Sequence, residues 1–307
     1  MQQMKILTII VTYNGLQWYD RCLGSLLAST IPVDVMVVDN ASMDGSADWI
    51  EAHYPGVNLI RSEKNLGFGQ ANNIGMRYAL DNGYDYVFLL NQDAWLHTND
   101  CIERLVQVAE NHLEYMIMSA LWLYGSGERI TKGSKLHMIA LEGPNNDFVS
   151  DLYLGRELKE VYETDYIGAA AWLLPRKTLE QIGGFDPLFF HRGEDDNYMQ
   201  RVHYHGGKIG LCAKACICHD IEERPADYDA EHENWNKNML MELADINSNK
   251  SIGQWKKQYL YRSLKQITYF HWYAAMSNLR IWRFIDRQQI VVENSIKTNQ
   301  MIGCHWL

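Results

Sequence analysis

The chain has 307 residues, of which 47% are hydrophobic and 21% charged, which is typical of a globular protein with one large or two smaller domains. Its formal net charge of −10 argues against general nucleic-acid binding, so we predict no nucleic-acid partner. The six cysteines lack the spacing of a small disulfide-rich domain. With neither a basic leader nor a long uncharged apolar window, the sequence predicts reduced thiols and a cytoplasmic location.

Apolar runs alternate with helical stretches in the first part of the chain. Short β-branched or apolar runs predict strands at 5–12, 33–38, 57–60 and 86–90. Between and after them, helices are expected at 17–28, 47–53, 70–80 and 100–112. This β-α alternation with short loops predicts an α/β fold, with a parallel sheet covered by helices on both faces.

The segment 85–95 is the centre of this pattern. Tyr86 to Leu90 is an unbroken apolar run, as in a strand buried on both faces, and it ends abruptly in Asn91-Gln92-Asp93. Comparable polar ends follow the first strand at 12–14 and the second at 39–40. In open α/β sheets, ligands bind outside the carboxyl ends of strands. These three ends therefore predict one pocket.

The second part of the chain is less regular. It contains a predicted strand at 115–124, a small-residue apolar stretch at 166–174 and two predicted closing strands at 208–211 and 215–219. Pro175 should open a short helix that Gly183 and Gly184 close. Three consecutive acids, 194–196, begin a further predicted helix. They complement its dipole, but successive side chains fan around the axis, so at least one should face the sheet.

Two other functions fit less well. A dinucleotide-binding dehydrogenase needs a glycine-rich turn after the first strand, where this chain has Thr12-Tyr13-Asn14-Gly15. A structural zinc site usually has a second cysteine pair at a distance, whereas here Cys212, Cys216 and Cys218 crowd beside His219.

Six motifs, spread over roughly residues 4–222, resemble the inverting family 2 glycosyltransferases of the GT-A fold. They are V-T-Y-N-G at 11–15, V-V-D-N-A-S at 37–42, N-L-G-F-G-Q-A-N-N-I-G at 65–75, L-N-Q-D at 90–93, G-G-F-D at 183–186 and G-E-D-D-N-Y-M-Q-R at 193–201. Within that family the sequence is most similar to bacterial rhamnosyl- and galactofuranosyltransferase-like members that build surface polysaccharide.

The resemblance implies a mostly parallel central sheet flanked by helices, of the nucleotide-diphospho-sugar transferase type. It implies a catalytic domain at 1–222, with a nucleotide-sugar half at about 1–115 and an acceptor half at about 116–222. A helical C-terminal extension at 223–307 would follow.

The resemblance also assigns roles to particular residues. Those expected to bind the nucleotide-sugar are Thr12, Tyr13, Asn14, Asp39, Asn65, Gly67 and Gln92. Asp93 and His219 would bind a divalent cation, Mg²⁺ or Mn²⁺, although Asn91 replaces the first acid of the family's D-x-D. Asp195 matches the catalytic base, and Glu194 is included in the catalytic set as its supporting acid.

The chemistry agrees with these roles. A divalent cation offsets the charge that develops on a nucleoside diphosphate leaving group, and a carboxylate takes the proton of the attacking acceptor hydroxyl. The resulting prediction is metal-dependent transfer, with inversion, from a UDP- or dTDP-sugar to a glycan or lipid-linked acceptor. The alternative is a nucleotide-sugar-binding protein without transferase activity.

The tail from Lys250 to Arg287 holds eight Lys or Arg residues against one acid, interleaved with aromatic residues. A basic aromatic helix of this kind can lie on an anionic membrane surface. It can equally pack on the catalytic domain or on a second subunit as a homodimer. Both interpretations stay open at this point.

Overall fold

The computed structural model describes residues 4–132, 147–221 and 238–307. The chain divides into two compact units: residues 1–228 with 302–307, and residues 229–301. The boundary predicted after residue 222 lies outside the described residues. Residues 302–307 pack on the first unit, where the His305 carbonyl accepts the N–H of Gly184 at 2.8 Å and the Trp306 carbonyl accepts from the Asn73 amide at 3.1 Å.

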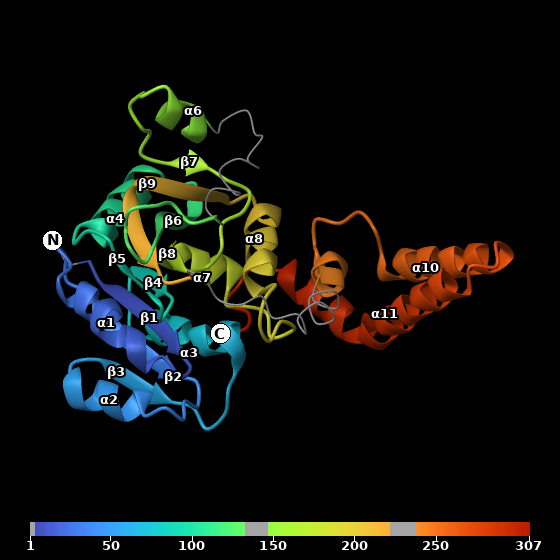
Figure 1. The fold of residues 1–307 in the computed structure, drawn as a ribbon, viewed down its shortest axis with the longest axis horizontal. Helices are drawn as coiled ribbons and strands as arrows, with labels where there is room; N and C mark the ends of the chain where they lie inside the picture. The colour runs from blue at the N-terminus through green and yellow to red at the C-terminus, as the bar shows by residue number, and fades with distance from the viewer. Residues whose placement is uncertain (1–3, 133–146, 222–237) are drawn as a thin grey trace. The chain divides into compact units, whose positions relative to one another are not determined.

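The first half of the sheet is the predicted parallel β-α array (Figure 1). Strands β1 (Ile6–Thr12), β2 (Asp34–Asp39), β3 (Asn58–Arg61) and β4 (Tyr86–Leu90) lie in the order β3-β2-β1-β4. The helices here are η1 (Leu16–Trp18), α1 (Tyr19–Leu27), α2 (Ser46–His53), α3 (Gly67–Asp81) and α4 (Cys101–Asn111). Thr12 and Asp39 stand side by side in the β1–β2 register, so both strands end at the same edge.

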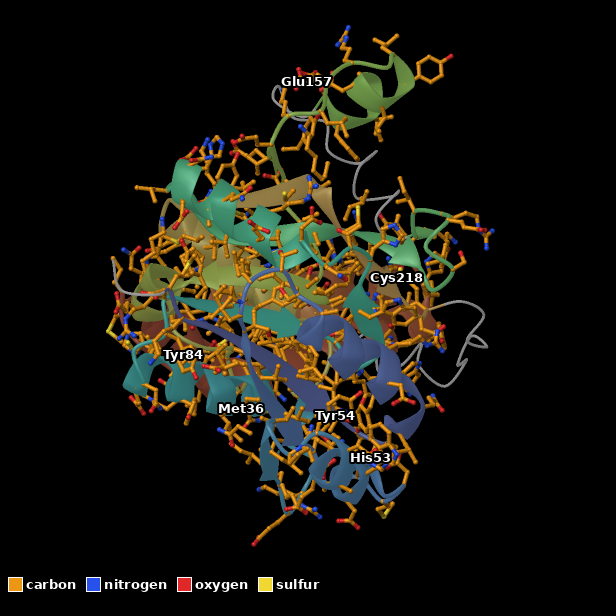
Figure 2. The ribbon with its side chains drawn as sticks, turned by 90° about the vertical axis from the view of Figure 1, so that its left-hand side faces the viewer. Met36, His53, Tyr54, Tyr84, Glu157 and Cys218 are labelled. Atoms are coloured by element: carbon orange, nitrogen blue, oxygen red, sulfur yellow. The ribbon has the colours of Figure 1, made fainter. Side chains whose placement is uncertain are left out.

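Burial explains why these strands have no polar alternation. Met36 lies on β2 (Figure 2). It and its neighbour Val37 point to opposite faces of the sheet, and both are fully buried. A strand covered on both faces must be apolar at successive positions, as the sequence is.

The second half of the sheet is mixed. It contains β5 (Ala94–Leu96), β6 (Tyr115–Tyr124), β7 (Tyr162–Glu163), β8 (Ala171–Pro175) and β9 (Lys208–His219). Strand β8 runs antiparallel between β4 and β6, β9 runs parallel to β6, and β5 and β7 pair antiparallel with β9. Six of the nine strands formed by the described residues share one direction, which confirms the predicted mostly parallel sheet.

One detail of the strand prediction is wrong. The predicted closing strands at 208–211 and 215–219 are one strand, β9, because a register shift opposite Ala120 and Leu121 absorbs the extra residues. In the apolar stretch 166–174, only the part from Ala171 onward is a strand, and the preceding residues form a loop.

Buried polar contacts position the helix that carries the acids. The first unit also contains α6 (Phe148–Tyr153), α7 (Arg176–Ile182) and α8 (Glu194–Tyr204). The fully buried Arg201 guanidinium of α8 donates to the carbonyls of Ile182 at 2.9 Å and Gly184 at 2.6 Å, and it lies 4.8 Å from the Tyr198 ring centroid. These bonds satisfy the C-terminal carbonyls of α7 and fix α8 against it. Gly183, at φ +80°, ends α7 as predicted.

The second unit contains a helical hairpin. Helix α10 (Ile252–Thr268) starts with a capping box between Ser251 and Gln254, and α11 (Trp272–Asn299) follows a three-residue turn. The predicted basic aromatic helix is thus two helices that pack on each other. No helix among the described residues combines the length and the apolar character needed to cross a membrane.

Candidate active site

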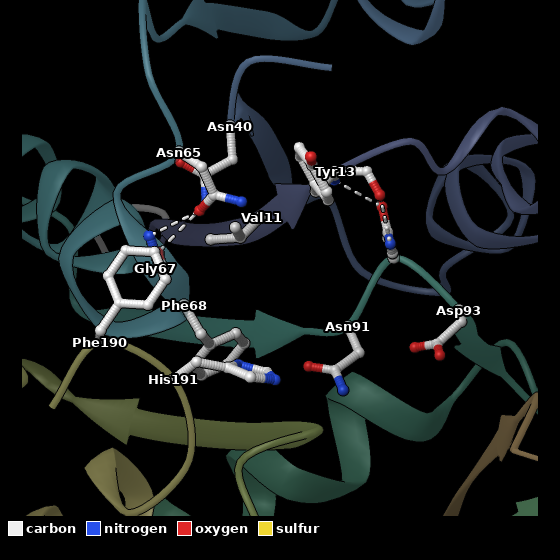
Figure 3. Close-up of a pocket in the computed structure, with 11 residues that line it drawn as sticks. Val11, Tyr13, Asn40, Asn65, Gly67, Phe68, Asn91, Asp93, Phe190 and His191 are labelled. Atoms are coloured by element: carbon white, nitrogen blue, oxygen red, sulfur yellow. Dashed lines mark hydrogen bonds between the residues drawn. The ribbon is translucent and has the colours of Figure 1, made fainter. Parts of the chain in front are cut away.

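A pocket of about 430 Å³ opens at the carboxyl ends of β1, β2 and β4 (Figure 3). It is lined by Val11, Tyr13, Asn40, Asn65, Gly67, Phe68, Asn91, Gln92, Asp93, Phe190 and His191. The three polar strand ends that the sequence singles out therefore meet, as expected for this edge of an α/β sheet.

Gln92 ties the end of β4 to the loop after β1. Its Oε1 accepts from the Thr12 hydroxyl at 2.6 Å and from the Tyr13 N–H at 3.0 Å, while its Nε2 donates to the Tyr13 carbonyl at 3.2 Å. Thr12 is fully buried, whereas Tyr13 is 44% exposed and lines the pocket. Thr12 and Gln92 thus position Tyr13, and both Tyr13 and Gln92 line the pocket.

The loops after β1 and β2 are joined by a second set of bonds. The Asn14 N–H donates to the Ser42 hydroxyl at 2.9 Å, and the Asn14 Oδ1 accepts the Met43 N–H at 2.9 Å. Asp39 accepts the Ser42 N–H through Oδ2 at 3.2 Å, and its buried Oδ1 has no hydrogen-bond partner among the described residues. Neither Asn14 nor Asp39 is among the residues that line the pocket. A buried carboxylate oxygen without a donor is a candidate acceptor for a ligand N–H.

Asn40 was missed as a site residue, although the sequence marks it as part of a polar strand end. Its Nδ2 donates to Asn65 Oδ1 at 2.9 Å and its Oδ1 accepts the Leu66 N–H at 2.7 Å, while Asn65 Oδ1 also accepts the Gly67 N–H at 2.8 Å. Asn65 and Gly67 therefore reach the pocket as predicted, held there by Asn40.

Phe190 and His191, from the loop before α8, line the pocket beside Gly67 and Phe68 (Figure 3). A Cβ at Gly67 would overlap the Phe190 carbonyl oxygen, and one at Gly69 would lie 2.7 Å from the Phe185 Cβ. The two glycines of G-F-G therefore allow this loop to approach α3 closely. Sequence reasoning missed both Phe190 and His191, because only the folded chain brings them to this wall.

Asp93 and His219 meet through the pairing of β5 with β9. Ala94 lies opposite His219 in that pairing, and the Asp93 carbonyl accepts the Asp220 N–H at 2.8 Å. His219 Nε2 lies 3.2 Å from Asp93 Oδ1, and both side chains are about nine-tenths buried. A carboxylate oxygen is a ligand that Mg²⁺ or Mn²⁺ prefers, so Asp93, with His219 beside it, would be the residue to hold such a cation here. No group of three His, Cys, Asp or Glu side chains suited to a metal occurs among the described residues.

Trp122 connects this pair to the acidic residues. Its ring meets the His219 ring edge-to-face, with centroids 5.5 Å apart. A Cβ at Gly168 would lie 2.8 Å from Trp122 Cη2 and 3.5 Å from Asp195 Oδ2. The site is therefore continuous from His219, across Trp122, to Asp195. Trp122 was not predicted, and the small residues at 168–170 were the only sequence signal for close approach here.

The acids 194–196 share the start of α8. Arg192 at φ +67° and Gly193 at φ +92° turn the chain into the helix. Asp195 Oδ1 accepts the Asp196 N–H at 3.0 Å, and Glu194 is buried. Burial, followed by the charge of Asp195, raises the pKa of Asp196 well above its ordinary value. The pKa of Tyr166 is also raised, first by burial and then by Asp195 and its two neighbours.

The chain matches known proteins in both sequence and structure. Residues 8–183 match the model of glycosyl transferase family 2. An N-acetylglucosaminyl-diphospho-decaprenol L-rhamnosyltransferase of Mycobacterium tuberculosis is 26% identical over 270 residues, which are 81% of this chain and 85% of that protein. An undecaprenyl-phosphate mannosyltransferase of Micrococcus luteus is 36% identical over 107 residues, 34% of this chain and 44% of that protein.

Solved structures share the fold at low identity. The mannosyltransferase PcManGT of Pyrobaculum calidifontis, in complex with GDP-Man and Mn²⁺, has a TM-score of 0.57 at 16% identity and covers 96% of this chain and 76% of its own. S. aureus TarS 1-349 in complex with UDP-GlcNAc has a TM-score of 0.55 at 15% identity, and the match covers 82% of this chain and 70% of the TarS chain.

Proposed function

The chain belongs to glycosyl transferase family 2, and from this premise we propose that it moves a sugar from a UDP- or dTDP-sugar to an acceptor hydroxyl with inversion. The fold is GT-A, and the family and its relatives support glycosyl transfer in glycan synthesis. The observation that carries the proposal is a row of neighbouring side chains: Asp93 lies 3.2 Å from His219, the His219 ring packs on Trp122, and Trp122 and Asp195 both lie near Gly168. We assign the Asp93 end of this row to the leaving group and the Asp195 end to proton acceptance, as a single displacement requires.

The nucleoside is assigned to the Tyr13 and Asn65 side of the pocket. Tyr13 offers an exposed ring for stacking, and Asn65 lines the same wall. The partnerless Oδ1 of Asp39 can accept the imide N–H that uracil and thymine share. We therefore assign this oxygen to the base of the UDP or dTDP donor.

The diphosphate is assigned to the Asp93 end. Asp93 and His219 are the residues that would hold Mg²⁺ or Mn²⁺, which would neutralise charge on the departing diphosphate. The pairing of β5 with β9 keeps these two side chains in place. Asn91, which lines the same end, contributes a neutral amide where a second acid is usual in the family, so Asp93 carries the charge there.

Asp195 is the proposed general base, with Glu194 supporting it. Its Oδ2 lies near Gly168, 3.5 Å from where a Cβ of that residue would be, and we assign the approach of the acceptor hydroxyl to this carboxylate, opposite the leaving group. A base on that face gives inversion without a covalent intermediate. The raised pKa of Asp196 also suits proton acceptance near neutral pH, so any test must compare the two residues.

The acceptor is proposed to be a glycan or a lipid-linked saccharide of a bacterial surface polysaccharide, with the reaction in the cytoplasm. The rhamnosyltransferase relative, whose name includes a diphospho-decaprenol, supports the lipid-linked form. Product analysis of reactions with polyprenyl-diphosphate saccharides tests this part separately from donor use.

The rival is a protein that binds nucleotide-sugars without transferring them, since Asn91 leaves the D-x-D incomplete. A thermal-shift panel of UDP- and dTDP-sugars with Mn²⁺ should identify the donor, because a bound ligand stabilises the folded state. Slow hydrolysis of that donor, stimulated by Mn²⁺, then supports the transferase. Stabilisation without hydrolysis, and without transfer to any supplied acceptor, supports the rival.

A further inference from the structure

We propose that the tip of the α10–α11 hairpin, defined as residues 257–283, binds the surface of an anionic lipid membrane. This surface belongs to the second unit and includes no residue of the pocket. The proposal therefore goes beyond the transfer reaction and does not depend on it.

The tip exposes an unusual amount of aromatic and aliphatic surface. In and beside the turn, Tyr269 is 60% exposed, Phe270 78%, Trp272 60% and Tyr273 88%. The exposed surface continues along both helices with Leu260, Tyr261, Leu264, Ile267 and Met276. Leu260, Leu264 and Ile267 stand at i, i+4 and i+7, so they share one face of α10. An exposed apolar cluster of this kind marks an interaction site.

The tip is an ordered turn. The His271 N–H donates to the Gln266 carbonyl at 2.9 Å, and the His271 ring contacts Gln266 Oε1 at 3.0 Å. Behind the turn, the buried Ser263 hydroxyl donates to the Ala275 carbonyl at 2.8 Å and holds the two helices together. The aromatic residues therefore face outward from a fixed backbone, which lowers the entropy lost on binding.

Basic residues surround this apolar surface. Exposed cations stand at Lys257, Arg262, Lys265, Arg280 and Arg283, and the sequence has no Asp or Glu from 257 to 285. Among the described residues, none of these five cations forms a salt bridge.

The cations stand at a depth that suits a membrane surface. Lys257 precedes Leu264 by seven residues, and Arg280 follows Tyr273 by seven, so each shares a face with its apolar partner about 10 Å farther from the turn. With the hairpin axis along the membrane normal and the turn inserted to the usual interfacial depth of about 5–10 Å, both cations would stand at the headgroups.

The positive charge of the tip favours an anionic membrane as its partner. An anionic bilayer strengthens binding by about fivefold for each Lys or Arg near its surface. Two copies of the tip would instead bring five cations against five, so a second copy is the poorer partner. The tip would lie on the membrane surface, in agreement with the lack of a spanning helix among the described residues.

Vesicle co-sedimentation of the full chain, without donor or acceptor, tests the proposal. Vesicles of phosphatidylcholine with about 30% phosphatidylglycerol should bind the protein, and phosphatidylcholine alone should bind it at least about tenfold more weakly. Phe270→Ser with Tyr273→Ser should lower binding to anionic vesicles at least about tenfold by removing inserted rings. Tyr153→Ser, at a residue of the first unit that is as exposed as Tyr273, is the matched control and should change nothing.

Lys257→Gln with Arg280→Gln is a second, independent variant. It should weaken binding by about 25-fold and reduce its dependence on salt. Equal binding to neutral and anionic vesicles, or unchanged binding by both double variants, would overturn the proposal. So would a concentration-dependent dimer in sedimentation equilibrium that Phe270→Ser with Tyr273→Ser dissolves, if the wild-type protein ignores vesicles. Because no sugar is present, a failure here is separate from a failure of the transferase proposal.

Discussion

The two ends of the site are built on opposite principles. At the proposed nucleoside end, Gln92 binds the Tyr13 backbone and Asn40 binds Asn65, so polar side chains satisfy one another in hydrogen bonds. At the acidic end, Asp195 and Asp196 crowd one helix start, where burial and mutual charge raise the pKa of Asp196. The first end is organised before any ligand arrives, while the second holds charge in an unfavourable environment.

This difference predicts how substitutions behave. Changes at the nucleoside end should act on affinity and stability, because they displace loops that the hydrogen bonds hold. Changes at the acidic end should act on turnover, because the acids are costly to keep ionised there and contribute little to holding the fold. The following variants test that separation.

Asp195→Asn should give the largest effect. The change preserves size and removes the proton acceptor, so turnover should fall by about 10²–10⁴-fold while donor affinity barely changes. Initial rates of transfer and calorimetric donor titration measure the two quantities. Glu194→Gln and Asp196→Asn are the matched controls, and their turnover should fall less than that of Asp195→Asn. If Asp196→Asn abolished turnover while Asp195→Asn kept nearly normal turnover, Asp196 would be the general base instead of Asp195.

Gly67→Ala should be the most destabilising single change at the nucleoside end. Gly67 has φ +78°, and an added Cβ would overlap the Phe190 carbonyl oxygen. Left-handed strain and the clash together should lower the free energy of unfolding by about 2–4 kcal/mol. Gly83→Ala is the control, because Gly83 has φ +70° and open space around it, so only the strain of about 1–2 kcal/mol applies. Equal losses in urea unfolding would show that the loop before α8 can retreat from α3.

Gln92→Ala should weaken nucleotide binding by about tenfold. It removes the acceptor for the Thr12 hydroxyl and the Tyr13 N–H, which releases the loop that carries Tyr13. Gln107→Ala, at an exposed position on α4, is the control. Calorimetry with UDP measures both. Full affinity in Gln92→Ala would mean that Tyr13 is held by other contacts or does not touch the nucleotide.

Local patterns explain how much of this structure could be predicted from the sequence. The parallel half follows from apolar runs, helix signals and polar strand ends, all of which are read within a few residues. The reversed direction of β8 and the single strand β9 depend on pairing between segments far apart in the chain, which no local pattern encodes.

The site divides in the same way. Tyr13, Asn65 and Asp93 were predicted at the pocket and lie there. Trp122 and His191 were missed, because they reach the site only through long-range packing. Thr12 and Gln92 were also predicted to bind the ligand; Gln92 lines the pocket, whereas Thr12 is fully buried and contacts Gln92. Sequence position alone could not separate lining residues from those that support them.

Asp196→Asn should give the smallest effect, in stability. The folded-state pKa of this acid is raised above its unfolded value, so the folded protein binds the extra proton and loses stability as pH rises from about 4 through the raised pKa. The Asp196→Asn variant has no carboxyl to titrate at this position, so it does not lose this stability as pH rises. Its melting temperature should therefore equal that of the wild-type protein near pH 4 and exceed it at pH 8. A variant less stable at pH 8 would show that the helix-dipole contribution of the charge dominates.

Calorimetric titration of UDP, with Mn²⁺ and with EDTA, tests the division of the site most directly. In the wild-type protein Mn²⁺ should strengthen UDP binding, and Asp93→Asn should abolish that gain while leaving the affinity in EDTA unchanged. Asp195→Asn should retain the full gain, because its carboxylate belongs to the other end of the site. An undiminished Mn²⁺ effect in Asp93→Asn, or its loss in Asp195→Asn, would contradict the assignment of leaving group and base to separate ends.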